Sequence, residues 1–293
     1  MSPQNWGLGG RWGTIDTMRL TGVIHFDELS PDIWVRANKD RGYRASICPI
    51  DGDSPDDIVR AYRDAALAAD LPIAEVGVWR NTIGPDPVAR EAAIAYSIKQ
   101  LDLADRLGAR CCVNGPGSRH ADGYGPHPDN LSADTFDLIV ETTRRIIDAV
   151  KPTRTYFTLE PMPWIAPHSP ESYLDLIKAI DRPRLGVHLD PVNMINSVDR
   201  YYNNAAFISH CFALLGPHIR SCHAKDVAIR TPLTLHLDEC RPGLGVIDWS
   251  TYIREIDKVD LDMPLVIEHL STDDEYRAAA DYIRKREGVL STD

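Results

Sequence analysis

The sequence predicts a single (β/α)8 TIM barrel over residues 1–293, and three observations support this fold. Short apolar runs alternate with helical patterns along nearly the whole chain, as expected for repeated βα units around a parallel sheet. Eight such runs occur, which fits a closed barrel better than an open doubly wound sheet. The GxGxxG turn that an open sheet often carries does not follow the first run.

The predicted elements follow one another in a regular order. The eight predicted strands are LTGVIHF (20–26), YRASICPI (43–50), IAEVGVW (73–79), ARCCVNG (109–115), TYFTLEP (155–161), LGVHLDP (185–191), IRSCHAKD (219–226) and LVIEHL (265–270). Intervening segments such as SPDDIVRAYRDAALAADL and SADTFDLIVETTRRIIDAV open with Ser or Asp caps and carry apolar residues at i, i+3 and i+4, which predicts helices.

Three segments fall outside the simple βα repeat. Residues 1–18 are expected to form an N-terminal arm. The Pro- and Gly-rich segments 114–130 and 227–248 are too long for plain βα turns. Both are expected to project from the C-terminal face, where barrels of this class keep their active sites.

The composition favours a protein that acts on a small-molecule substrate. The chain has 43 acidic and 32 basic residues, and its net charge of -11 disfavours a nucleic-acid or anionic-membrane partner. The six cysteines show no CxxC spacing and are interpreted as reduced core residues. The N-terminus lacks an apolar signal region, and no stretch approaches the ~20 apolar residues of a membrane span. A cytoplasmic protein is expected.

Charged or polar side chains interrupt four of the apolar runs near their ends. Glu160 ends the fifth predicted strand, Asp190 ends the sixth, and His223 and Glu268 lie late in the seventh and eighth. A single residue of this kind is as often a loop or ion-pair residue, but a buried carboxylate needs a cation or dense hydrogen bonding. Because the ends of adjacent parallel strands meet at one face, the four are expected to form one site.

Three carboxylates and one imidazole form a hard, oxygen-rich ligand set. Such a set suits a six-coordinate Mn²⁺ or Mg²⁺ better than a thiolate-bound Zn²⁺. An octahedral ion with four protein ligands keeps two neighbouring positions for two adjacent substrate oxygens, such as those of a hydroxy-ketone.

Five short strings, in this order and spacing, resemble the xylose isomerase-like TIM barrels: LEPMPW, GVHLDPVN, HAKD, GLGVIDW and VIEH. That family includes sugar isomerases, sugar 3-epimerases, hydroxypyruvate isomerase, inosose dehydratase and endonuclease IV. The resemblance covers about residues 20–285. It implies a divalent metal, Mn²⁺ first and Mg²⁺ or Co²⁺ as alternatives, bound by Glu160, Asp190, His223 and Glu268. In the epimerase branch the two matching glutamates also move protons, and the residue matching His188 binds substrate. A buried core histidine, or one behind the metal ligands, is the alternative for His188.

The expected function is a metal-dependent isomerase or epimerase of a ketose or keto-polyol. One glutamate would remove the proton next to a carbonyl, the metal would stabilise the enediolate, and the other glutamate would return a proton. Trp79 and Trp164 are expected to wall the pocket and stack on a sugar, with simple packing as the alternative. Lys225 and Asp226 resemble the Lys–Asp pair that follows the metal histidine in several branches; an ion pair at the surface or behind the metal ligands is the alternative.

Two other activities are weighed against this one. A lyase or dehydratase acting on a keto-sugar, inosose or 3-keto-glycoside shares the first proton abstraction, so the sequence separates it poorly. An endonuclease IV-like enzyme is disfavoured, because Trp79, Asn114 and Asn193 stand where that branch places histidines. The sugar and its phosphorylation stay open. A homo-oligomer also stays open, since dimers and tetramers are common in the resembling family.

Overall fold

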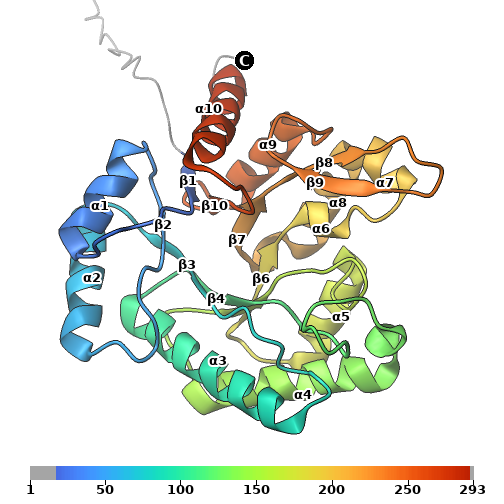
Figure 1. Ribbon diagram of the computed structural model, residues 1–293, viewed down its shortest axis with the longest axis horizontal. Helices are drawn as coiled ribbons and strands as arrows, with labels where there is room; N and C mark the ends of the chain where they lie inside the picture. Colours follow the sequence, from blue (N-terminus) through green and yellow to red (C-terminus); the bar gives the residue numbers. More distant parts are fainter. Residues whose placement is uncertain (1–17, 291–293) are drawn as a thin grey trace, which may run out of the picture.

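The computed structural model describes residues 18–290, and it confirms the predicted (β/α)8 barrel (Figure 1). The predicted N-terminal arm, residues 1–18, lies outside the described residues except for Met18. Every barrel strand overlaps its predicted run. The strands are β1 (Arg19–Gly22), β2 (Ser46–Ile47), β3 (Ile73–Gly77), β4 (Cys111–Asn114), β5 (Phe157–Leu159), β6 (Leu185–Leu189), β7 (Ile219–Ala224) and β10 (Pro264–Ile267).

The eight strands form one parallel sheet in the order β1-β10-β7-β6-β5-β4-β3-β2. The two end strands of this order, β1 and β2, complete the ring without a regular ladder. The backbone N–H of Arg44, just before β2, donates to the carbonyl of Leu20 in β1 at 3.0 Å. The sheet is therefore a nearly closed barrel, and its strand ends converge at one mouth.

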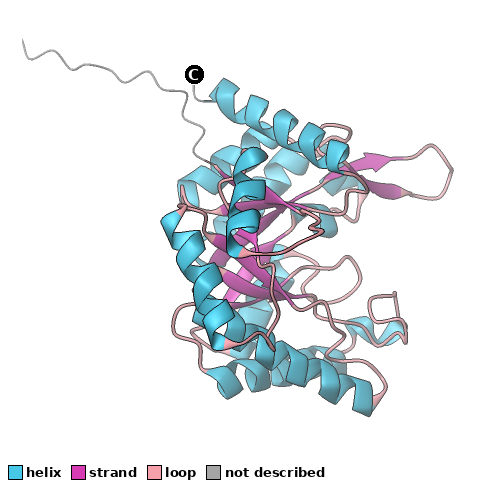
Figure 2. Cartoon of the chain, turned by 60° about the vertical axis from the view of Figure 1, so that its left-hand side comes forward, coloured by secondary structure: helices cyan, strands magenta, loops and turns pink. Residues whose placement is uncertain are grey.

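Helices surround the barrel (Figure 2). The long ones are α1 (Pro31–Asp40), α2 (Asp56–Ala68), α3 (Pro87–Leu107), α4 (Ala133–Val150), α5 (Pro170–Ile180), α8 (Asn204–Leu215), α9 (Trp249–Val259) and α10 (Asp273–Leu290). The short ones are η1 (Pro128–Leu131), α6 (Pro191–Met194), α7 (Val198–Tyr202) and η2 (Gly216–His218).

The predicted helix caps are confirmed at one segment and wrong at another. The Ser132 side chain accepts the N–H of Thr135 and caps α4, as its sequence predicts. In contrast, Ser54 does not cap α2. Pro55 is the N-cap residue there and makes no side-chain cap bond, while the Ser54 hydroxyl donates to Asp51 instead. A proline at this place fixes the entry of the chain without an oxygen acceptor.

Of the two long segments at the barrel mouth, only one forms strands of its own. Segment 227–248 contains most of an antiparallel hairpin of β8 (Asp226–Ile229) and β9 (Leu237–Cys240) that projects from the barrel (Figure 1). The sequence did not predict these strands. Segment 114–130 contains the start of η1 but no strand beyond the end of β4.

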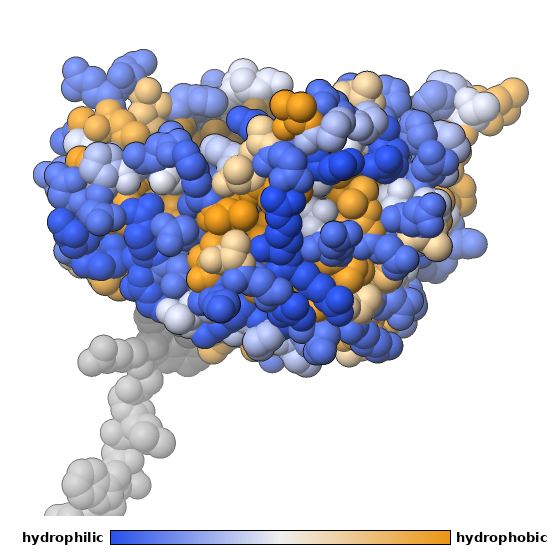
Figure 3. Space-filling view, turned by 90° about the horizontal axis from the view of Figure 1, so that it is seen from below, coloured by the Kyte–Doolittle hydropathy of each residue, from blue (hydrophilic) through white to orange (hydrophobic). Residues whose placement is uncertain are grey.

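The core lies between the sheet and the helices and is built from large apolar side chains such as Trp34, Leu101, Phe157 and Trp249. All six cysteines are free; four of them are buried as core residues, whereas Cys48 and Cys240 are only partly buried. Figure 3 shows one face of the molecule, on which hydrophilic residues surround smaller hydrophobic areas. Within residues 18–290, no helix has the length and apolar character needed to cross a bilayer.

Candidate active site

The barrel mouth brings the four predicted metal ligands together. Glu160 directly follows β5, Asp190 follows β6, His223 belongs to β7 and Glu268 follows β10. One ligand atom from each lies within 4.8 Å of the others, and all four side chains are buried. The sheet order explains this meeting, because β10, β7, β6 and β5 are consecutive neighbours in the barrel.

Local structure fixes where these carboxylates point. The Glu160 N–H donates to the carbonyl of Asn114 at 2.8 Å and extends the β4–β5 pairing by one residue. Asp190 is the N-cap of α6, and its Oδ1 accepts the N–H of Asn193 at 3.1 Å. Pro191 follows at the first helical position, which ends the strand and turns the chain. The other oxygen, Oδ2, lies 2.8 Å from Lys225 Nζ.

His223 lies between the two glutamates. Its Nδ1 is 3.0 Å from Glu160 Oε1, 2.6 Å from Glu268 Oε1 and 3.9 Å from Asp190 Oδ2. Burial lowers the pKa of this imidazole, but Glu268 and Glu160 outweigh burial and raise it well above its usual value. The neighbouring carboxylates therefore favour the protonated form of this imidazole.

Lys225 reaches into the same cluster, with only 2% of the residue exposed. Its Nζ lies 2.6 Å from Glu268 Oε1, 2.8 Å from Asp190 Oδ2 and 3.4 Å from Glu160 Oε1. The structure thus shows a buried ion pair, because the ammonium faces the carboxylates that end β5, β6 and β10 and not a surface partner. A contact between Lys225 and a substrate stays a prediction.

The electrostatics of the cluster favour added positive charge. Burial raises the pKa of Asp190 to about 6, although Lys225 opposes this. For Glu160, burial also acts to raise the pKa, but Lys225 and His223 outweigh it and hold the pKa well below its usual value. The Lys225 pKa is lowered by burial and raised more strongly by Asp190 and Glu160, so the amine stays charged.

The residues present fit a divalent cation. Asp190 Oδ2 and Glu268 Oε1 are buried oxygens that accept no hydrogen bond with good geometry from the described residues, although Lys225 lies close to both. The Lys225 ammonium already lies among the three carboxylates, so the site accommodates positive charge. The carboxylate oxygens and one imidazole nitrogen form the donor set that Mn²⁺ or Mg²⁺ prefers.

The two predicted tryptophans lie at the mouth and are partly exposed, by 38% for Trp79 and 36% for Trp164. The Trp79 ring centroid is 6.3 Å from that of His223, and Trp79 lines a cavity of about 520 Å³ beside β2 and β3. Trp79 adopts a left-handed backbone with φ of 51°, which is a strained conformation for a large side chain. Gly77 makes room for its indole, since a Cβ there would lie 2.2 Å from Trp79 Nε1. Trp164 Nε1 donates to the Tyr124 carbonyl at 2.9 Å.

Other residues of the site were missed from the sequence. Glu75 is buried in β3 and its Oε2 lies 3.5 Å from His223 Nε2. It interrupts the apolar run IAEVGVW, which is the same signal that identified the other carboxylates. Asn193 donates from Nδ2 to Glu160 Oε1 at 3.1 Å. Glu239, on the hairpin, lies 3.1 Å from His269 Nδ1, and only the folded hairpin brings it to the mouth.

His188 is fully buried below the mouth. Its ring meets the ring of His223 edge to face, with centroids 3.9 Å apart. Burial is the main cause that lowers the pKa of His188 well below its usual value, and His223 adds to it. A direct contact between His188 and a substrate stays a prediction.

Asp226, the first residue of β8, anchors the GLGVIDW segment. Its carboxylate accepts the backbone N–H groups of Val227, Gly243 and Ile247 at 2.9–3.0 Å and the indole N–H of Trp249 at 3.1 Å. Gly245 packs so closely that a Cβ there would lie 2.2 Å from Asp226 Oδ1. The aspartate therefore holds the chain that follows the hairpin.

Asp226→Asn is expected to destabilise the fold by about 2–4 kcal/mol, because an amide nitrogen would face N–H donors and the charged acceptor would be lost. Urea unfolding followed by circular dichroism measures the effect, with the exposed Asp137→Asn as control. Equal free energies of unfolding for both variants would contradict this role.

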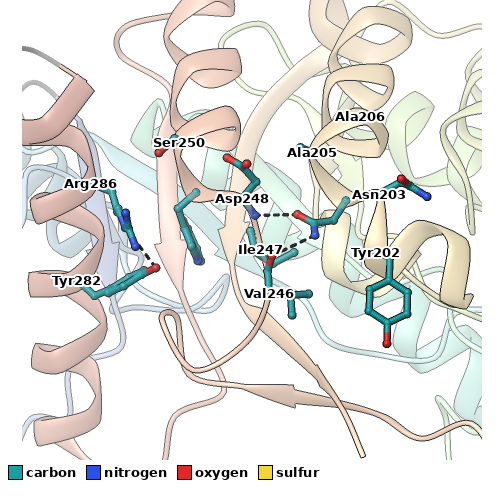
Figure 4. Close-up of a pocket in the computed structure, with 12 residues that line it drawn as sticks. Tyr202, Asn203, Ala205, Ala206, Val246, Ile247, Asp248, Ser250, Tyr282 and Arg286 are labelled. Carbon is teal, nitrogen blue, oxygen red and sulfur yellow. Dashed lines mark hydrogen bonds between the residues drawn. The ribbon is translucent and has the colours of Figure 1, made fainter. Parts of the chain in front are cut away.

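A separate cavity of about 500 Å³ lies beside the start of α8, the segment 246–250 and the end of α10 (Figure 4). Its polar groups serve the local structure. Asn204 Oδ1 accepts the Asp248 N–H at 2.7 Å and Asn204 Nδ2 donates to the Val246 carbonyl at 3.0 Å. None of its lining residues belongs to the carboxylate cluster. The candidate active site is therefore the cluster at the barrel mouth.

Known proteins share this fold. A family model described as "Xylose isomerase-like TIM barrel" matches residues 38–286. A 3-keto-D-glucoside 4-epimerase from E. coli is 17% identical, with a TM-score of 0.66 over 94% of this chain and 100% of that chain. A probable 3-DHS dehydratase from Bacillus anthracis is 16% identical, with a TM-score of 0.66 over 94% and 98%.

A xylose isomerase-like TIM barrel protein from Mycobacterium smegmatis, solved in complex with magnesium, is 17% identical, with a TM-score of 0.64 over 91% of each chain. A search of curated proteins gave no match to the sequence. At such low identities the similarity to these structures concerns the fold.

Proposed function

The chain belongs to the xylose isomerase-like TIM barrel family, and from this premise we propose that it is a divalent-metal-dependent isomerase or epimerase of a ketose or keto-polyol. The observation that carries the proposal is the convergence of three carboxylates and one imidazole at the barrel mouth. The epimerase from E. coli with the same fold supports the reaction class.

Glu160, Asp190, His223 and Glu268 are the proposed metal ligands, with Mn²⁺ as the proposed ion and Mg²⁺ or Co²⁺ as alternatives. The two unbonded carboxylate oxygens and the hard donor set support this assignment. The magnesium complex of the protein from Mycobacterium smegmatis supports a divalent ion in this fold. When bound, the ion supplies positive charge next to the substrate oxygen that becomes negative as the neighbouring carbon loses its proton.

Glu160 and Glu268 are the proposed proton-moving groups. They follow β5 and β10, which β6 and β7 separate in the sheet. A small substrate at the mouth would therefore meet a carboxylate on each side. One glutamate takes the proton from the carbon next to the carbonyl, and the other returns a proton from the opposite face. Metal ligation would favour the ionised form of both glutamates, which suits the one that acts as base and weakens the other as an acid. The second glutamate would therefore have to take up a proton before it returns one.

The surrounding residues are proposed to bind the sugar. Trp79 and Trp164 are proposed to cover its ring at the mouth, and Lys225 is proposed to hold a hydroxyl or carbonyl oxygen once it leaves the carboxylates. His188 is also predicted to bind the substrate. A small-molecule substrate, with no nucleic-acid or membrane partner, agrees with the net charge of -11. The unpaired cysteines support a cytoplasmic location.

A lyase or dehydratase acting on a keto-sugar, inosose or 3-keto-glycoside is the second candidate. The probable dehydratase from Bacillus anthracis, which shares the fold, favours it. Its first step would use the same base and the same ligands. An endonuclease IV-like activity has less support, because the side chain at position 193 is an asparagine that hydrogen-bonds Glu160.

Deuterium exchange tests the proposal. We expect enzyme loaded with Mn²⁺ to place deuterium on the carbon next to the carbonyl when it is incubated in D₂O with ketoses, inososes or 3-keto-glycosides. All the candidate reactions begin with removal of the proton from that carbon. Mass spectrometry and NMR of the products then separate epimer, isomer and cleaved or dehydrated product. Chelator-treated enzyme is the control. Cleavage of apurinic DNA without exchange into any sugar would contradict the proposal.

A further inference from the structure

Three polar side chains form a buried group directly beneath the carboxylate cluster. Glu75 from β3, His188 from β6 and His223 from β7 approach one another inside the barrel. Glu75 Oε2 lies 3.5 Å from His223 Nε2 and 3.8 Å from His188 Nδ1. One carboxylate oxygen therefore faces one nitrogen of each imidazole.

These atoms are unsatisfied within the part of the chain that the structure describes. Glu75 Oε2, His223 Nε2 and both ring nitrogens of His188 are buried and have no hydrogen-bond partner there. Buried polar groups are rarely left without a partner, and His223 Nε2 and His188 Nδ1 are the two ring nitrogens near the Glu75 carboxylate. A shift of a few tenths of an ångström brings His223 Nε2 within ordinary hydrogen-bonding distance of Glu75.

The orientation of His223 suggests what the contact between Glu75 and His223 Nε2 does. Its Nδ1 faces Glu160 and Glu268 at 3.0 and 2.6 Å, so its Nε2 is the nitrogen on the far side from the cluster. A metal-binding histidine usually donates its second ring N–H to a carboxylate, which fixes the tautomer and raises the basicity of the coordinating nitrogen.

We infer that Glu75 is a positioning residue that accepts N–H bonds from both His223 Nε2 and His188 Nδ1. The first bond presents the Nδ1 lone pair of His223 to the proposed metal, and this part rests on the proposed function. The second bond holds His188 as its Nδ1–H tautomer. The held His188 ring then supports His223 edge to face at a centroid distance of 3.9 Å.

The test compares the wild-type protein with Glu75→Gln and with Thr21→Val as a matched control. Thr21 is another buried barrel residue whose hydroxyl lacks a partner among the described residues, so its replacement also removes a buried polar group. Isothermal titration with MnCl₂ is expected to give 10–100-fold weaker binding for Glu75→Gln and unchanged binding for Thr21→Val. Thermal unfolding in EDTA checks that both variants fold.

A second measurement needs no metal. Nitrogen-15 spectra of histidine-labelled, metal-free wild-type protein are expected to show His188 protonated at Nδ1, and Glu75→Gln is expected to change that signal more than Thr21→Val does. Wild-type His188 protonated at Nε2, or equal Mn²⁺ affinity in wild type and Glu75→Gln, would overturn the inference. Wild-type protein that binds no Mn²⁺ would instead overturn the proposed function, while the His188 spectrum would still decide the role of Glu75.

Discussion

Replacing Glu160 or Glu268 by glutamine is expected to lower kcat by about 10²- to 10⁴-fold, the usual contribution of a positioned proton-transfer group. The amide keeps an oxygen for the metal but has no basicity, so saturating Mn²⁺ is expected to restore binding and not turnover. The measurement is kcat with the substrate found by deuterium exchange, at increasing Mn²⁺ concentrations.

Asp190→Asn is the matched control for these variants. Asp190 belongs to the same cluster and caps α6 through its other oxygen, but it is proposed only as a ligand. Its amide variant should lose mainly Mn²⁺ affinity and recover activity at high Mn²⁺, because occupancy follows mass action. If high Mn²⁺ restores all three variants equally, the two glutamates only bind the metal and another residue moves the proton.

Lys225→Met is expected to destabilise the metal-free protein by about 3–5 kcal/mol, because it removes the charge partner of buried carboxylates. The same change is expected to tighten Mn²⁺ binding, since the ammonium that lies 2.6 Å from Glu268 and 2.8 Å from Asp190 no longer competes with the ion. Added Mn²⁺ should therefore stabilise the variant more than the wild type. Thermal unfolding in EDTA and in MnCl₂, together with calorimetric titration, measures both effects.

Lys258→Met provides the control for Lys225→Met. Lys258 pairs with Glu255 at 3.0 Å on the surface, and 58% of its side chain is exposed. Its loss is expected to change the stability little and the Mn²⁺ affinity not at all. Weaker Mn²⁺ binding in Lys225→Met than in the wild type would contradict competition and would mean that the lysine supports the metal site.

The sequence by itself determined the barrel and the positions of its four proposed ligands. Apolar runs of strand length must be buried between helices, so their number and order define the sheet. A carboxylate at the end of such a run, as in LGVHLDPVN, has only the barrel mouth to face. For this reason Glu160, Asp190, His223 and Glu268 meet in the structure as expected.

The tertiary structure alone decided which side chains touch. Lys225 and Asp226 are adjacent in sequence, yet the lysine enters the carboxylate cluster and the aspartate binds backbone N–H groups of segment 243–249. Successive residues of a strand point to opposite sides, and what lies on each side depends on distant segments.

Strand register is the second factor that the sequence leaves open. The pairing of β6 with β7 shifts between Val187 and His188, which places His188 opposite Ser221. The heights of Glu75, His188 and His223 inside the barrel follow from such shifts, and local residue patterns do not encode the relative heights of separate strands. The position of Glu75 beneath the proposed metal site therefore follows only from the assembly of β3, β6 and β7 into one barrel.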